Sequence, residues 1–170
     1  MASLSTGPNM AHQFYMTFKG TKQGTFKGQG TKQKEGRIPG VAFEFGAEVA
    51  FDPASGQSTG RHQHTPIVIK KEVDAASPQL LQALATNEVL KLVQLVFFDT
   101  PGDGKEVVYH TITLTNAMIC RFREFLQLGE KGGPVVDSRL LDEISLTYQK
   151  IEMENVLGGT QASDDWLATS

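Results

Sequence analysis

The chain has 170 residues, of which 39% are hydrophobic and 21% charged, and its formal net charge at pH 7 is −3. This composition is typical of one globular domain, and the weak negative charge gives no general attraction to nucleic acid or an anionic membrane. The single cysteine, Cys120, excludes an internal disulfide and is compatible with a reducing cytoplasm. No apolar run is as long as a transmembrane helix, so we expect no membrane insertion.

The chain begins with a polar segment, residues 1–9, that precedes a second methionine, Met10. It lacks a basic stretch followed by an apolar one, so we predict no secretory signal peptide. We interpret residues 1–9 as an added leader or an unpaired tail. A single domain is expected over residues 10–170.

The first half of the chain predicts short strands separated by turns. Aromatic residues mark a strand over 14–19, and alternating apolar residues predict a half-buried strand over 41–51. Between them, residues 20–40 are rich in glycine and lysine and predict a basic, turn-rich segment. Residues 52–64 contain almost no apolar residue and predict a long exposed loop, which in compact domains is often functional. A further strand is expected over 66–73.

One helix is predicted, within residues 76–87. Ser77 is the expected N-cap, and Asn87 is a plausible end because asparagine tolerates the left-handed conformation. Three leucines share one face at helical spacing, which we expect to pack on a sheet or barrel: Leu80, Leu81 and Leu84.

The second half predicts strands over 89–99, 107–117, 117–128 and 144–153, followed by a polar tail from Asn155. Within the third of these, strict alternation places Ile119, Arg121 and Phe125 on one face. The sum is about eight strands with one helix and frequent turns, which indicates a mainly β fold, either a barrel or a sandwich.

The sequence contains few candidate motifs for cofactor binding, metal binding or catalysis. The glycines from Gly28 lack the third glycine of a dinucleotide-binding loop, so we predict no cofactor. His62 and His64 lie on one side of an extended segment, but a metal needs a further ligand and no nearby spacing supplies one, so no metal site is predicted. Cys120 with His110, or a serine with a histidine, stays open as nucleophile and base, because such partners meet in space. Without a nucleophile motif, we predict no enzyme.

A series of short motifs occurs in a fixed order along the chain. They are GRHQHTP (60–66), KKE (70–72), ASPQL (76–80), NE (87–88), LTNA (114–117) and SDDW (163–166). With the glycine-rich segment 20–40, this series strongly resembles the haemolysin-coregulated protein (Hcp) family from Met10 to the C-terminus.

The resemblance implies a β-barrel with a flanking helix that assembles into six-membered rings. Such rings stack into the inner tube of the bacterial type VI secretion system, inside a contractile sheath on a baseplate, with a spike protein at the tip. The lumen carries small effectors. The tube protein leaves the bacterial cytoplasm without a signal peptide when the system fires.

A ring needs a head-to-tail contact that closes, and stacking needs a second contact that does not close. We expect the exposed loop to reach the next ring through Asp52, Pro53, Ser55, Gly56, Gln57, Gly60, Arg61 and His62. Subunit contacts are expected at Lys32, Lys34, Arg37, Asp164, Asp165 and Trp166. The alternative is a monomeric barrel that binds a cargo or acts as a small hydrolase, with His62, His64, His110 and Cys120 as the first residues to consider.

Overall fold

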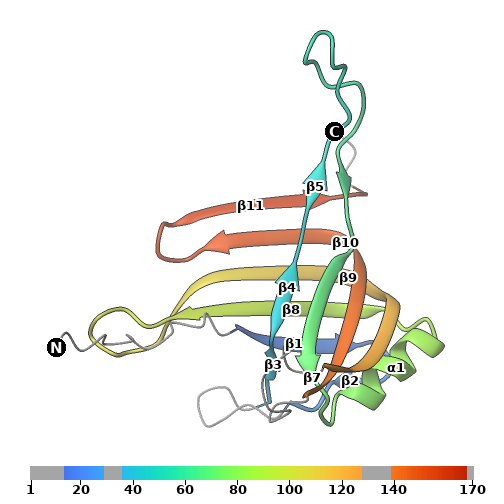
Figure 1. Cartoon of the computed structure of the whole chain (residues 1–170), viewed down its shortest axis with the longest axis vertical. Coiled ribbons are helices and arrows are strands. Elements are labelled where there is room, and N and C mark those ends of the chain that lie inside the picture. Colours follow the sequence, from blue (N-terminus) through green and yellow to red (C-terminus); the bar gives the residue numbers. More distant parts are fainter. Residues whose placement is uncertain (1–13, 29–35, 128–138, 168–170) are drawn as a thin grey trace, which may run out of the picture.

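The computed structural model describes residues 14–28, 36–127 and 139–167. These residues form eleven strands and one helix (Figure 1). The elements are β1 (Phe14–Gly20), β2 (Gly24–Thr25), β3 (Ile38–Gly40), β4 (Ala42–Glu44), β5 (Ala47–Glu48), β6 (Gln63–His64), β7 (Ile67–Glu72), α1 (Ser77–Ala85), β8 (Leu90–Asp99), β9 (Val107–Gln127), β10 (Arg139–Asn155) and β11 (Thr160–Asp165). The predicted mainly β fold with one helix is confirmed. The predicted leader, residues 1–9, lies outside the described residues.

The main sheet closes on itself through one short segment. Its strand order is β2-β1-β8-β9-β10-β7-β4, with β3 on β1 and β11 on β10. β3 pairs with β1 at one edge, and β4, which follows after Val41 alone, pairs with β7 at the other. The Val41 N–H donates to the Lys70 carbonyl at 2.8 Å. The segment from β3 to β4 therefore joins the two edges of the sheet into a barrel. Closure of this kind gives hydrogen-bond partners to the backbone N–H and C=O groups of the edge strands.

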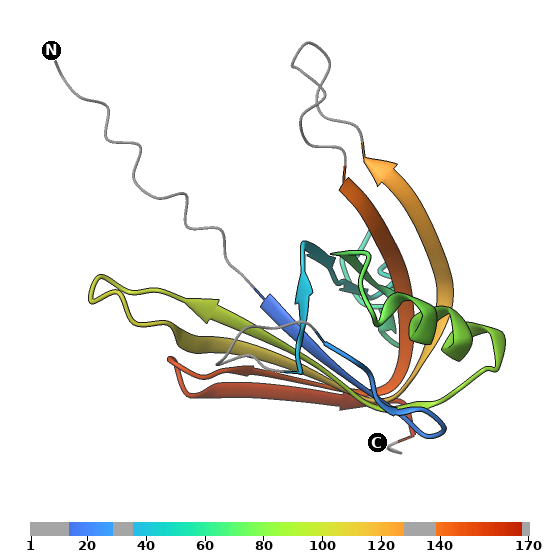
Figure 2. The ribbon, with the colours of Figure 1, turned by 90° about the horizontal axis from the view of Figure 1, so that it is seen from below.

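The longest strands, β9 and β10, pair along most of their length and bend sharply (Figure 2). Their register shifts where Ile119 faces Leu146 and Arg121 faces Ser145, which leaves Cys120 as an extra residue. A bulge of this kind turns the following side chains to the other face and bends the strand. Phe122 consequently packs against the core, whereas Arg121 is exposed. The predicted alternation therefore fails across Cys120, because Ile119 and Arg121 do not share a face.

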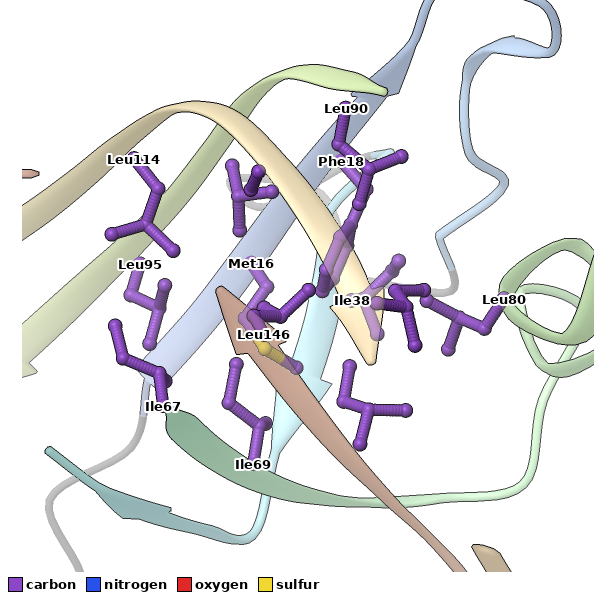
Figure 3. Close-up of a cluster of buried hydrophobic side chains, with 14 of the residues drawn as sticks. Met16, Phe18, Ile38, Ile67, Ile69, Leu80, Leu90, Leu95, Leu114 and Leu146 are labelled. Atoms are coloured by element: carbon purple, nitrogen blue, oxygen red, sulfur yellow. The ribbon is translucent and has the colours of Figure 1, made fainter. Parts of the chain in front are cut away.

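The core fills the inside of the barrel (Figure 3). Alternate residues of β1 point inward, as the aromatic segment predicts, and both Met16 and Phe18 are fully buried. Figure 3 shows them beside side chains from β3, β7, β8, β9 and β10, with Leu80 reaching in from α1. Burial of each such side chain contributes about 1.5–3 kcal/mol to folding.

Helix α1 begins and ends near the predicted limits, but its cap differs. Ala76 is the N-cap and no side chain caps it, because the Ser77 hydroxyl is turned into a buried polar cluster. Asn87 adopts a left-handed φ of 50°, as expected. Leu80 is buried and Leu84 packs against the core, but Leu81 is 50% exposed, so the predicted three-leucine face is only partly used.

Two other predicted segments differ from the structure. The single strand expected over 41–51 is broken at Phe45 and Gly46, because β4 pairs with β7 whereas β5 pairs with β6. The polar tail expected from Asn155 instead turns back as β11, which pairs with the end of β10. In the part of the chain that the structure describes, no helix combines the length and the apolar character that crossing a membrane requires.

Candidate functional site

A hairpin arm, residues 47–64, projects from the barrel (Figure 1). β5 and β6 form its stem, where Ala47 pairs with His64, and farther out Phe51 forms an isolated bridge with Ser58. The Thr59 N–H donates to the Ala50 carbonyl at 2.8 Å. The segment predicted as a long exposed loop is thus an exposed hairpin held by its own backbone bonds.

The tip of the arm is a turn organised by Asp52. Its Oδ1 accepts the Ala54 N–H at 3.0 Å and its Oδ2 accepts the Ser55 hydroxyl at 2.9 Å. Gly56 closes the turn on the Asp52 carbonyl with φ of +70°, which glycine adopts without steric cost. The Ala54 N–H and then the Ser55 hydroxyl hold the pKa of Asp52 below 3.8, so the tip carries a negative charge at neutral pH.

The arm also exposes apolar side chains. Phe51 is 63% exposed and Val49 is 43% exposed, although the alternating pattern of residues 41–51 placed Val49 on an inward face. Neither belongs to the hydrophobic core of this chain. An aromatic side chain on a projecting element is suited to burial against another surface.

A second group of residues, which we call the base cluster, fixes the stem of the arm to the C-terminal strand. It consists of His62, His64, Tyr148, Asp164 and Trp166. Both histidine Nε2 atoms lie 2.6 Å from Asp164 Oδ2, and the Tyr148 hydroxyl lies 2.8 Å from His64 Nδ1. The Trp166 ring stacks on His62 at 6.0 Å and meets His64 edge-on at 5.2 Å.

The surroundings set the protonation of Asp164 and Tyr148 in this cluster. The His62 and then the His64 bond lower the pKa of Asp164, which is therefore a carboxylate at neutral pH. Burial, and then the Asp164 charge, raise the pKa of Tyr148 to about 12, so its hydroxyl keeps its proton. In neutral His64, Nε2–H donates to Asp164 and Nδ1 accepts from Tyr148.

The structure brings together residues that the sequence placed in separate groups. His62 belongs to the predicted stacking loop, whereas Asp164 and Trp166 are predicted subunit contacts, and all three meet within one chain. Asp165 has other partners: its Oδ1 accepts hydrogen bonds from Gln149 Nε2 at 3.4 Å and from the Leu167 N–H at 2.9 Å.

The other predicted contact residues are distributed over the arm and β3. Asp52, Pro53, Ser55, Gly56 and Gln57 form the arm tip, and Gly60 and Arg61 are exposed on its return side. Arg37 is half-buried just before β3. Lys32 and Lys34 lie outside the described residues.

The sequence alone did not predict that Asp164 contacts both His62 and His64. Asp164 lies 100 residues beyond His64, and only the turn into β11 brings it back beside the stem. No local spacing carries this information. The available signal was an acidic pair beside the chain's single tryptophan, in a segment that the sequence predicted to be a polar tail.

The structure separates Cys120 and His110, which the sequence left open as a nucleophile and its base. Cys120 and His110 stand ten residues apart on β9, which corresponds to about 30 Å along a strand. The exposed Cys120 thiol lies 3.4 Å from the Ser145 carbonyl, and the His110 ring packs at 5.7 Å from Phe97. These two residues therefore do not form a nucleophile–base pair.

Comparison with known proteins assigns the fold to a family. The family model described as "Type VI secretion system effector, Hcp" matches residues 15–154. A curated relative from Pseudomonas aeruginosa, named "Major exported protein", is 35% identical over 167 residues, which cover 92% of this chain and 96% of the relative.

Comparison with solved structures also finds Hcp proteins. A crystal structure of an Hcp protein is similar with a TM-score of 0.81 at 25% identity, over 94% of this chain and all of that one. A variant Hcp1 from Escherichia coli EAEC 042 gives 0.79 at 27% identity, over 92% and 99% of the two chains. The secreted protein Hcp3 from P. aeruginosa gives 0.72 at 28% identity, over 93% and 100%. With a matching family model over most of its length and a relative above 30% identity, the chain belongs to the Hcp family of type VI secretion proteins.

Proposed function

We propose that this protein is a structural subunit of the inner tube of a type VI secretion system. Six copies form a ring, rings stack into a tube, and small effector proteins travel in the lumen. The observation that carries the proposal is the hairpin arm, which leaves the barrel, exposes Phe51 and adds nothing to its own chain's core. An element that a monomer does not need is explained by a second copy that covers it.

The arm supplies the contact between rings. A ring uses one head-to-tail contact that closes, so stacking needs a separate surface that points out of the ring. The base cluster holds the stem of the arm against β11, so the tip is presented in a fixed direction. The apolar Phe51 contributes buried area, and the charged Asp52 and Arg61 contribute polar contacts at the rim.

The same proposal includes export. The relative named "Major exported protein" supports a protein that leaves the cell, and membership of the type VI family supports this system as the route. In the bacterial cytoplasm the tube is surrounded by the sheath, rests on the baseplate and carries the spike protein at its tip.

The test is the native mass of the purified protein, measured by light scattering, with negative-stain images of the same peak. We expect a particle of six chains with a central opening. A monomer at all concentrations would contradict the ring. It would favour the alternative of a monomeric cargo-binding barrel or small hydrolase, whose first residues to test are His62 and His64.

A further inference from the structure

The base cluster contains three atoms that converge on one point. His62 Nε2, His64 Nε2 and Asp164 Oδ2 all lie within 4.8 Å of one another, and each nitrogen is 2.6 Å from the same oxygen. They come from the stem of the arm and from β11, two segments about 100 residues apart. Two imidazole nitrogens and one carboxylate oxygen are a common ligand set for zinc.

The spacing of these atoms is close to that of a tetrahedral site. With zinc–ligand distances of about 2.1 Å, neighbouring ligand atoms of a tetrahedron stand about 3.4 Å apart. Each nitrogen–oxygen contact, now 2.6 Å, must therefore open by about 0.8 Å to admit the ion. His62 and Asp164 can make this adjustment by side-chain rotation, because their side chains are 54% and 35% exposed, whereas His64 is only 9% exposed and stays fixed.

The groups around the three ligands already hold them in the required orientation. Tyr148 contacts Nδ1 of His64, so Nε2 points at the centre of the cluster. When Nε2 binds a metal, Nδ1 carries the proton and donates to the Tyr148 oxygen, so the existing contact is kept with its direction reversed. Trp166 meets the His64 ring edge-on at 5.2 Å and so helps to hold this least exposed ligand, while the stacked contact with His62 at 6.0 Å leaves that exposed ring able to adjust.

The surroundings also leave room for a fourth ligand. The side chains of His62 and Asp164 are 54% and 35% exposed, so solvent reaches the cluster from their side. A water molecule in the fourth position would complete the tetrahedron. Magnesium and calcium are poor matches, because both prefer oxygen ligands throughout.

We propose that His62, His64 and Asp164 bind one zinc ion per chain, with a water molecule as the fourth ligand. The ion joins the stem of the arm to β11 more firmly than the hydrogen bonds alone. By linking two segments that are distant in the sequence, the ion fixes the direction of the arm.

The test uses the full chain without an affinity tag, treated with a chelator and then dialysed at neutral pH. Calorimetric titration with zinc should show saturable binding of one ion per chain, and magnesium should show none. Replacement of zinc by cobalt should give the strong visible absorption of a tetrahedral complex. The proposal would be overturned if the native chain showed no saturable zinc binding. It would also be overturned if bound cobalt gave the weak visible spectrum of an octahedral aqueous ion.

Variants locate the site. Asp164→Asn and His62→Gln keep side-chain volume but each remove a ligand, and we expect both to abolish saturable binding. Tyr148→Phe removes only the support of His64, and we expect affinity to fall by about tenfold. Circular dichroism of each variant checks that the barrel is folded.

Matched controls carry the same chemical groups elsewhere. Asp165→Asn removes the adjacent carboxylate, and His12→Gln and His110→Gln remove the other two histidines of the chain. We expect native affinity from all three. Zinc affinity that falls with His12→Gln and not with Asp164→Asn would show binding outside the cluster and would overturn the assignment. Because binding is measured on the isolated chain, this result is independent of whether rings or tubes form.

Discussion

Lys71 is a fully buried ammonium that ties the start of α1 to the barrel. It lies 2.9 Å from Asp142 on β10 and 2.8 Å from Asp74, and it donates to Ser77 Oγ at 3.1 Å. The Ser77 hydroxyl in turn donates to Asp142. Asp142 is itself fully buried, and its Oδ1 has no hydrogen-bond partner among the described residues. This carboxylate therefore depends on Lys71 for compensation of its charge.

Lys71→Met should lower the free energy of unfolding by about 3–5 kcal/mol, because it leaves buried carboxylates without their cation. The measurement is urea unfolding followed by circular dichroism. Lys70→Met is the matched control: its ammonium is 41% exposed and lies 3.7 Å from Glu143, a surface pair worth at most about 1 kcal/mol. Equal losses from the two variants would contradict the assigned role of the cluster.

Asp52 gives a pH-dependent prediction at the arm tip. Since its pKa is lower in the folded chain than the ordinary 3.8, its bonds stabilise the turn above pH 3.8 and are lost as the pH falls through the lowered pKa. The Ala54 amide resonance should therefore titrate with a midpoint below 3.8. Asp52→Asn should remove this titration. A midpoint at or above the ordinary value would show that the turn does not hold the carboxylate.

At the scale of elements, α1 offers two adjacent leucines in different environments. Leu80 is fully buried in the core, whereas Leu81 is 50% exposed. Leu80→Ala should cost about 2–5 kcal/mol of unfolding free energy, because it removes buried methyl groups and leaves a cavity. Leu81→Ala should change it by no more than about 0.5 kcal/mol. The same urea unfolding experiment compares the two variants. A larger loss of unfolding free energy in Leu81→Ala than in Leu80→Ala would show that a different face of the helix packs on the barrel.

The elements that the sequence predicted well are those whose side chains alternate regularly. β1 and β7 bury every second residue, and the apolar spacing of α1 located the helix within a residue or two. The bulge at Cys120 could not be predicted, because it depends on the register between β9 and β10. β11 was missed for a related reason: its side chains are polar and mostly exposed, and only pairing with β10 makes it a strand.

At the scale of the whole molecule, the arm should separate stacking from ring formation. Residues 50–59 can be replaced by an Asn-Gly turn, which closes a two-residue hairpin on the remaining stem. We expect rings of unchanged mass that no longer form tubes, as seen by light scattering and electron microscopy. The matched control shortens the exposed β8–β9 turn, residues 100–106, and should still form tubes. Unaltered tube formation without the arm would contradict its stacking role.

The basic segment between β1 and β3 gives a second prediction about assembly. We expect its cations, including Lys32, Lys34 and Arg37, to meet acidic groups on a neighbouring subunit. Such contacts weaken as added salt screens the charges over about 10 Å at 0.1 M. The fraction of assembled protein, measured by sedimentation, should fall as ionic strength rises. Assembly that is unchanged by salt would exclude these charges as the main contact.

Membership of the family could be predicted from the ordered motifs, because residues 60–66 and 163–166 are specific in series, and the exposed segment 52–64 from its near-absence of apolar residues. The geometry of the base cluster could not. His62 and Asp164 are joined only because the chain turns at Gly158 and Gly159 and returns as β11 alongside β10. The glycine pair predicts a turn, but the polar residues after it do not predict a strand.

The closure of the barrel through β3 and β4 has a consequence for synthesis of the chain. One edge of β1 pairs with the nearby β2 and β3, and one edge of β7 pairs with β4, but the other edges must wait for β8 and β10. Residues Arg139–Asn155 of β10 leave the ribosome near the end of translation. Contacts between such distant segments make folding slow and leave strand edges unpaired meanwhile. The nascent chain therefore cannot complete its barrel in stages. A chain truncated before residue 139 would leave open the edges of β7 and β9 that pair with β10, available to chaperones or to other chains.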